Sequence, residues 1–176
     1  MREAIGGTWL FQIVIFFILL FTGYMCLTIN QSKAFNVKNQ IIETIQSYNG
    51  IDLNGGYNSR NQDAFTDIVN YIQENSFRTT GYIPDAEEIN DQTYRYECFD
   101  RNGQNVGNNG DRAVFCITKI DVSEDASIPS DSANELPSLA YYRVVVFYRL
   151  DLPIFGSLFN FQITGDTRLL PAGVYS

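Results

Sequence analysis

The residues of this chain that could do chemistry are carboxylates, amides and cysteines, because the sequence contains no histidine. That absence excludes Ser-His-Asp and Cys-His catalysis and every zinc site that uses histidine. We find no converging pair of carboxylates that would supply a general acid and a general base. The sequence therefore predicts a protein that is not an enzyme, with no catalytic residue and no cofactor.

Oxygen-bearing side chains recur at alternate positions in the loop from Asp100 to Asp111, as they do in calcium-binding loops. The candidate ligands are Asp100, Asn102 and Asp111. The loop lacks a glycine at its sixth place, a terminal glutamate and flanking helices, all of which calcium loops of this kind carry. A flexible turn without a metal is therefore the favoured interpretation.

Two of the cysteines, Cys98 and Cys116, lie in polar segments that are typical of neighbouring strands. If that part of the chain lies outside the cytoplasm, we expect a disulfide between them. Their pairing would place the centre of a hairpin near Gly107, inside the loop. Cys26 lies in an apolar run, and we interpret it as a small buried hydrophobic residue rather than a reactive thiol.

A long helix and a small domain are expected to position these residues. The sequence pattern that predicts the helix is stronger than the pattern that predicts the domain. No charged residue occurs between Ala4 and Ser32. Such a run exceeds the roughly 20 apolar residues that cross a bilayer as a helix, and it is longer than the apolar core of a secretory signal, about 7–15 residues. The pattern predicts a membrane-inserted segment.

The helical pattern continues beyond this run, with apolar residues at three- and four-residue steps. They are Ala34, Val37, Ile41, Ile45 and Tyr48. Asn49-Gly50 supplies a stop signal, and no proline precedes it. We therefore predict one helix over residues 1–49, about 70 Å long, with a weak point at Thr22-Gly23.

An acidic residue, Glu3, stands directly before the uncharged run. A carboxylate near hydrocarbon is costly unless it is neutralised, so one interpretation pairs Glu3 with the amine of Met1 in an adjacent subunit, as a register device. The alternative is a carboxylate stabilised by the dipole at the start of the helix. Gly6, Gly7 and Gln12 are interpreted as contact points for close helix packing, with a processing site as the alternative for the glycines.

The remaining residues have the pattern of one small α+β domain. After a turn-rich stretch over 51–62, a second helix is expected from Asp63 to about Asn75. Its expected apolar face consists of Ala64, Phe65, Ile68, Val69 and Ile72. About four antiparallel strands follow, a number that rests on alternating apolar residues and turn signals. They cover 93–99, 112–122, 141–150 and 158–165, with an acidic, serine-rich loop over 123–138. The expected organisation is an apolar helix over 1–32, its amphipathic continuation over 33–49 and an extracytoplasmic head over 50–176.

Charge and aromatic content limit the partners of this head. The formal net charge of −8 argues against nucleic acid, because phosphates require a basic surface. The abundant aromatic residues could form a stacking platform for sugars or single strands. Packing in the core and across strands is the favoured interpretation, because the aromatic residues alternate within the predicted strands.

The order of these parts resembles the type IV pilins and pseudopilins: an apolar N-terminal helix with a glutamate near its start, and an amphipathic half backing onto a small antiparallel sheet. The tail from Tyr142 to Thr167 is similar to the closing hairpin of pilin-like proteins in the tight-adherence (Tad) branch. The resemblance covers the whole chain in architecture, and its specific motifs lie in residues 1–30 and 142–167.

The resemblance implies a structural subunit of an extracellular filament used for adhesion or surface attachment. Such a subunit is processed by a prepilin peptidase, waits among lipids in the cytoplasmic membrane, and is extracted by an ATPase-driven machine into a cell-surface filament of its own copies. By the same resemblance, Glu3 and Met1 of neighbouring subunits set the register. The residues expected in the filament core are Gly6, Gly7, Trp9, Phe11, Gln12, Ile13, Phe16, Phe17, Leu20 and Gly23.

Two other functions stay open on the sequence alone. One is a single-pass membrane protein whose outer domain binds a partner as a monomer, with its helix permanently in lipid. The other is a minor or priming pseudopilin of the same kind of machine.

Overall fold

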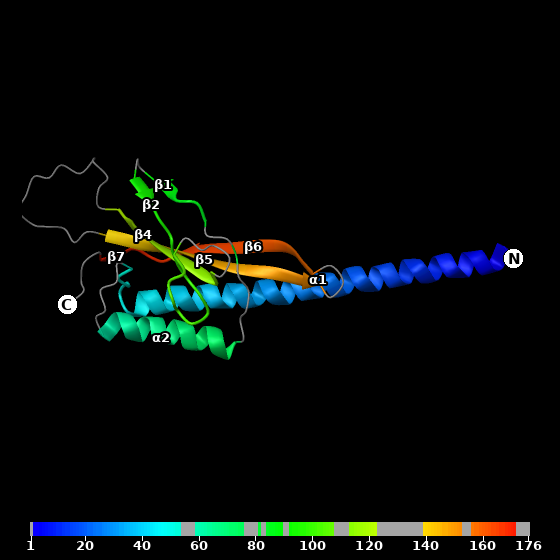
Figure 1. The fold of residues 1–176 in the computed structure, drawn as a ribbon, viewed down its shortest axis with the longest axis horizontal. Coiled ribbons are helices and arrows are strands. Elements are labelled where there is room, and N and C mark those ends of the chain that lie inside the picture. Colours follow the sequence, from blue (N-terminus) through cyan, green and yellow to red (C-terminus); the bar gives the residue numbers. More distant parts are fainter. Residues whose placement is uncertain are drawn as a thin grey trace, which may run out of the picture.

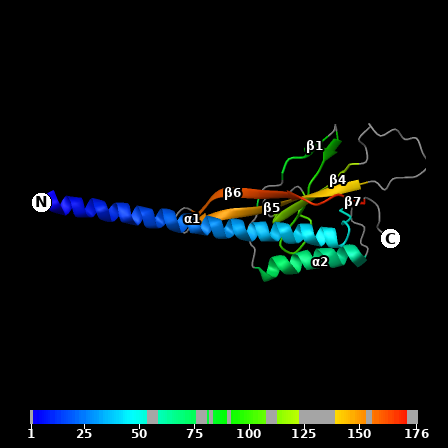
Figure 2. The same cartoon turned by 180° about the vertical axis from the view of Figure 1, so that it is seen from behind.

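The chain consists of a long helix and an α+β head that packs on the second half of this helix (Figure 1). The computed structural model describes residues 2–53, 59–75, 81, 84–89, 92–107, 113–122, 139–152 and 156–171. Helix α1 (Arg2–Ser47) has 46 residues and is unbroken, as the continuous pattern predicts. Its first half projects from the head, and the view from behind shows the same arrangement (Figure 2).

The C-terminal end of α1 is fixed by Asn49-Gly50, the predicted stop signal. Asn49 has a positive φ of 57°, and its N–H donates to the carbonyl of Gln46. The N–H of Gly50 donates to the carbonyl of Ile45 at 2.8 Å. Together these two bonds form a Schellman motif, which satisfies carbonyls that a helix end leaves without partners. The motif turns the chain back toward the head.

The second helix, α2 (Ser59–Glu74), lies against α1 and begins four residues before the predicted Asp63. The prediction that turns extend to residue 62 is wrong for residues 59–62, because these residues, Asn61 among them, already belong to the helix. The side-chain amide of Asn61 accepts from the N–H of Asp52 at 2.9 Å and donates to the carbonyl of the same residue at 2.7 Å. Three residues of the predicted apolar face, Ala64, Ile68 and Ile72, are fully buried, whereas Phe65 and Val69 are half-buried.

The head contains an antiparallel sheet with strand order β3-β4-β5-β6, in which β7 also pairs with β5. The strands of this sheet are β3 (Glu97–Phe99), β4 (Phe115–Asp121), β5 (Leu139–Leu152), β6 (Gly156–Asp166) and β7 (Leu170–Pro171). A separate two-stranded hairpin pairs β1 (Glu87–Ile89) with β2 (Gln92–Tyr94). Two helices and a small antiparallel sheet confirm the α+β class.

The structure corrects several predicted strand boundaries. The strand predicted over 93–99 is divided into β2 and β3, because β2 pairs with β1 whereas β3 pairs with β4. Between them, the carbonyl of Arg95 accepts from the hydroxyl of Thr118. The strand predicted over 112–122 begins only at Phe115, since Ala113 instead forms an isolated bridge with Gly81. Strands β5 and β6 extend beyond 141–150 and 158–165. The predicted loop over 123–138 lies outside the described residues.

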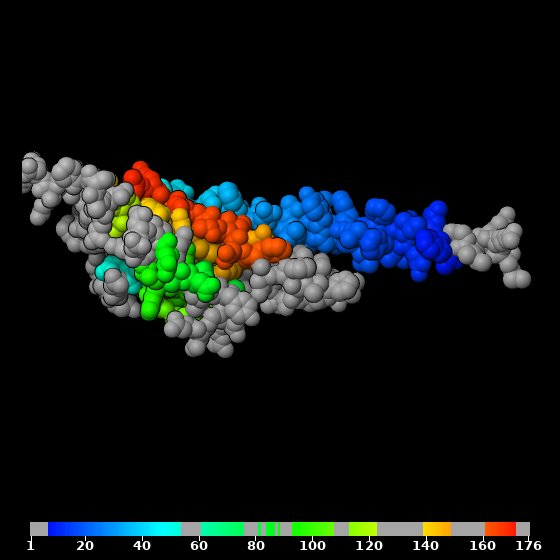
Figure 3. Space-filling model, turned by 90° about the horizontal axis from the view of Figure 1, so that it is seen from above, coloured from blue at the N-terminus to red at the C-terminus, as the bar shows by residue number. Residues whose placement is uncertain are grey.

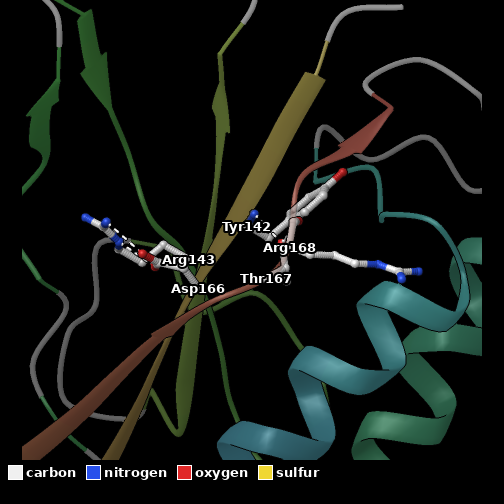
Figure 4. A network of polar contacts seen from close by, with 5 residues as sticks. All are labelled: Tyr142, Arg143, Asp166, Thr167 and Arg168. Carbon is white, nitrogen blue, oxygen red and sulfur yellow. Dashed lines mark hydrogen bonds and ion pairs between the residues drawn. The ribbon is translucent and has the colours of Figure 1, made fainter.

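Strand β7 continues the edge that β6 leaves, after an interruption at Thr167 (Figure 4). The hydroxyl of Thr167 accepts from the N–H of Tyr142 at 2.9 Å and donates to the carbonyl of Arg168. On the other side of the strand, the guanidinium of Arg143 makes two contacts with Asp166, at 2.8 and 3.0 Å. The N–H of Thr167 still donates to the carbonyl of Tyr142 at 2.9 Å, so the threonine hydroxyl replaces only the second backbone hydrogen bond of this pair.

The main core lies between the two helices and one face of the sheet. From α1 it receives Ala34, Val37, Ile41 and Ile45, four residues of the predicted apolar face, and all four are buried. Tyr48, the fifth predicted residue, follows α1 and is half-buried against this core. Alternate residues of β5 such as Val144 and Val146 belong to the same core, while Val145 packs in a second cluster on the opposite face. This alternation is the period of two that a strand imposes.

Lys38 is buried although it lies beside the apolar face of α1. Its side chain lies against β6 at Gly165, where an added Cβ would lie 2.8 Å from the Cδ atom of the lysine. Its ammonium nitrogen lies 4.3 Å from the centre of the Phe35 ring, a favourable cation–π distance. The missing side chain of Gly165 is what makes room for the lysine.

Candidate functional site: the exposed apolar half of α1

The first half of α1 exposes large apolar side chains along its length. They are Trp9, Leu10, Phe11, Ile13, Val14, Ile15, Phe16, Phe17, Ile18, Leu19, Leu20, Phe21, Tyr24, Met25 and Ile29, which are between 41% and 67% exposed. Figure 3 shows this half as a bare rod beyond the head. Full burial of an exposed side chain of this size stabilises it by about 1.5–3 kcal/mol, and these partly covered side chains would gain a part of that amount if they were covered.

These side chains occupy every side of the helix rather than one stripe. Residues 13 to 21 are apolar without interruption, so the apolar surface extends round the whole circumference. A helix that is apolar all round is typical of a membrane span or of a position enclosed by several neighbours. The described helix from Gly7 to Ser47 is long and apolar enough to cross a membrane, since an 18-residue window within it has a mean hydropathy of 2.4.

Two threonine hydroxyls of this half are bonded within the helix itself. The hydroxyl of Thr22 donates to the carbonyl of Ile18 at 2.7 Å, and that of Thr28 donates to the carbonyl of Tyr24 at 2.9 Å. Such internal bonds let a hydroxyl face an apolar environment without an unsatisfied group. The helix also continues without a break through Gly23.

The predicted packing residues are distributed along this rod. Trp9, Phe11, Ile13, Phe16, Phe17 and Leu20 are exposed apolar residues, Gln12 is exposed and Gly23 is half-buried. A Cβ added to Gly7 would meet no atom within 4 Å, so this glycine leaves a shallow place on the helix surface. Gly6 and Glu3 lie in the helix, but the exposure of Gly6, the side chain of Glu3 and the whole of Met1 lie outside the described part. The proposed pairing of Glu3 with Met1 stays a prediction.

The half of α1 that enters the head is held there by polar as well as apolar contacts. The phenol of Tyr48 donates to Asp67 of α2 at 2.9 Å. This hydrogen bond, partial desolvation and the negative charges of Asp67 and Asp63 raise the pKa of Tyr48 above its ordinary value near 10. The contact ties the end of α1 to α2.

A disulfide joins Cys98 of β3 to Cys116 of β4, the two cysteines that the sequence singles out. They lie directly opposite each other in the strand pair, and the register places the hairpin centre at Gly107, which has a positive φ of 54°. Cys26 is a free thiol and is half-buried on α1. The amide of Asn30 contacts its sulfur at 3.9 Å.

In the candidate calcium loop, the first carboxylate, that of Asp100, accepts hydrogen bonds from backbone N–H groups of the loop itself. One oxygen of Asp100 accepts the N–H groups of Asn102 and Gln104, each at 2.8 Å. Asp111 lies outside the described residues, and within the described part no three histidine, cysteine or acidic side chains are placed to hold a metal. What the structure describes here is a turn that Asp100 holds in shape.

Comparison with protein-family models, with curated proteins and with solved structures found no match to this chain.

Proposed function

We propose that this protein is a structural, non-enzymatic subunit of an extracellular filament of the type IV pilus kind, and that it polymerises through the exposed half of α1. The observation that carries the proposal is the division of one helix into two halves. The second half is the core of the head, and the first half is an apolar rod without a described partner in the same chain. The rod requires lipid or other subunits around it.

The proposed mechanism is an exchange of apolar surroundings. Before assembly, lipid of the cytoplasmic membrane covers residues 9–27, and in the filament the same segment of neighbouring copies replaces it. Because the apolar side chains lie on all sides of the rod, several neighbours can surround it at once. An ATPase-driven machine supplies the extraction, and adhesion or surface attachment is the proposed use.

Glu3 has a register role in this proposal. A carboxylate within an apolar bundle is stable only when a positive group neutralises it, so Glu3 selects the one axial position where a neighbour offers its amine. We expect Glu3→Ala to insert into the membrane normally and to form few or no filaments. Glu43→Ala, which removes an exposed carboxylate from the part of α1 inside the head, is the matched control and retains filaments.

The experiment is to shear cells, image the supernatant by electron microscopy and determine the N-terminus of the released protein by mass spectrometry. Fibres that contain mainly this chain support the proposal. Normal fibres from Glu3→Ala refute the register role of Glu3, but they do not contradict the proposed filament function. Absence of fibres, with monomers on detergent extraction, supports a single-pass binding protein instead, since the same apolar rod also suits a permanent anchor. Fibres made of another protein, with traces of this chain, indicate a minor or priming subunit.

A further inference from the structure

A cleft of about 570 Å³ opens in the head between α2, the chain that follows α1, and the turn after β3. Its volume lies within the range of about 300–1,000 Å³ that is typical of small-molecule sites. The cleft is far from the apolar rod in the sequence and uses none of its residues. It is therefore a separate candidate for binding.

The floor of the cleft is apolar and carries an aromatic ring. Phe65 of α2 and Phe99 of β3 have their ring centres 5.0 Å apart, and Phe99 stacks in turn on Phe115 at 5.3 Å. Phe99 and Phe115 are buried, whereas Phe65 is only half-buried and lines the cleft with Val69. The buried rings support Phe65 from behind.

The rim of the cleft consists of neutral amides and one hydroxyl. Gln62 and Thr66 of α2 face Asn102, Gln104 and Asn105 of the turn. Gln62, Asn102 and Gln104 are exposed, and their side-chain amides make no hydrogen bond to another described residue. They are available to a ligand as donors and acceptors. No lysine or arginine lines the described cleft, and its one carboxylate belongs to Asp52.

Both walls of the cleft are fixed before any ligand binds. The turn is held by the carboxylate of Asp100 and packs against α2 at Gly103, where an added Cβ would lie 2.6 Å from a methyl group of Val69. The opposite wall is held by the paired hydrogen bonds between Asn61 and Asp52. A preformed site of this kind loses little free energy to ordering on binding.

We propose that this cleft binds a neutral carbohydrate. A sugar ring has an apolar face of C–H groups that can lie on the half-exposed Phe65 ring, and hydroxyl groups at its edge that match the amides of the rim. The absence of cationic side chains, together with the Asp52 carboxylate, disfavours phosphorylated or acidic sugars. The proposal goes beyond the filament function and does not depend on it, because every residue involved belongs to one head.

The test uses the full chain in micelles of a detergent without a sugar headgroup. The protein is applied to an array of neutral oligosaccharides with their sialylated and phosphorylated counterparts, and the dissociation constant of the best neutral sugar is then measured by titration. We expect binding to neutral sugars, and preference over the acidic counterparts. Failure of every neutral sugar to bind, or binding of acidic sugars alone, overturns the proposal.

Two variants place the binding in the cleft. Gln62→Ala should weaken binding about 3- to 10-fold, the effect of one lost hydrogen bond, and Thr66→Trp should abolish it by filling the cleft. Gln73→Ala is the matched control, because it removes another exposed glutamine of α2 that does not line the cleft. Near-UV circular dichroism verifies that each variant is folded. Affinity unchanged in both cleft variants contradicts the assignment.

Discussion

Replacing Ile41 by alanine tests whether the second half of α1 is the core of the head. Ile41 is 1% exposed and belongs to the cluster shared by α1, α2 and the sheet. The change removes three buried carbon atoms, and such truncations cost about 2–5 kcal/mol because the space they leave does not collapse fully. Since domains of this size are stable by only about 5–15 kcal/mol, the loss is a large part of the total.

The assay is thermal unfolding of the full chain in micelles, followed by near-UV circular dichroism of tyrosine and phenylalanine. Trp9 lies on the rod, so tryptophan fluorescence does not report on the head. A loss of about 3 kcal/mol should lower the Tm of a domain of this length by roughly 10 °C. Retained helix signal with an earlier loss of the tyrosine signal would identify the head as the part that unfolds.

Ile29→Ala is the matched control, because it makes the same chemical change on the same helix where the side chain is 57% exposed. We expect its Tm to stay within about 2 °C of the parent, since exposed substitutions usually alter stability by less than about 0.5 kcal/mol. Equal shifts for Ile41→Ala and Ile29→Ala would refute the division of α1 into a rod half and a core half. An unchanged Tm for Ile41→Ala would do the same.

Three further predictions follow from single contacts. Replacing Cys98 and Cys116 together by alanine should cost about 3 kcal/mol, from the entropy of a loop of this length in the unfolded chain, and the same melting experiment measures it against the parent protein. Tyr48 should have a pKa above its ordinary value, so the stability that its hydrogen bond contributes is complete below pH 10 and is lost as the pH rises through the folded-state pKa. The absorbance at 295 nm of the parent minus that of Tyr48→Phe gives this pKa, and a value at or below 10 contradicts the reasoning. Gly50→Ala should lower the Tm by several degrees, because φ is +109° there and the new Cβ would lie 2.8 Å from the hydroxyl oxygen of Tyr142; Asn49→Ala offers a comparison at the neighbouring position, and a Tm equal to that of the parent would refute the strain.

The long helix and the register of the disulfide hairpin could be predicted because each depends on local pattern. A three- and four-residue apolar rhythm extends from Ala34 to Ile45, and its positions are the ones buried. In a hairpin, pairing Cys98 with Cys116 leaves only one possible centre, and Gly107 lies there. These features need no knowledge of the rest of the chain.

The short strands could not be predicted, because their pairing depends on residues far along the sequence. Strand β7 exists only because Leu170 reaches Ala140 after the gap at Thr167. The break between β2 and β3 reflects their pairing with different strands, β1 and β4, which nothing in the pattern over 93–99 indicates. The burial of Lys38 in α1 could not be predicted either, because it depends on Gly165, a residue of β6 far along the sequence.

The cleft was likewise invisible in the sequence. Its walls come from Asp52, Gln62 and Gln104, which only the packing of α2 on the turn brings together. The sequence places Phe65 on the apolar face of the second helix together with Ile68 and Ile72, which are buried, whereas the structure leaves Phe65 half-buried. Asp100 drew attention as a metal ligand, and its carboxylate proves to shape the wall of the cleft.

The continuity of α1 has a mechanical consequence. No turn or linker separates the rod from the part of the same helix that is enclosed by the head. A pull along the rod is therefore transmitted directly to Val37 and Ile45, and it loads the contact between helix and sheet in shear over several turns at once. Tension on one end of this molecule is resisted by the core of the other end rather than by a flexible tether.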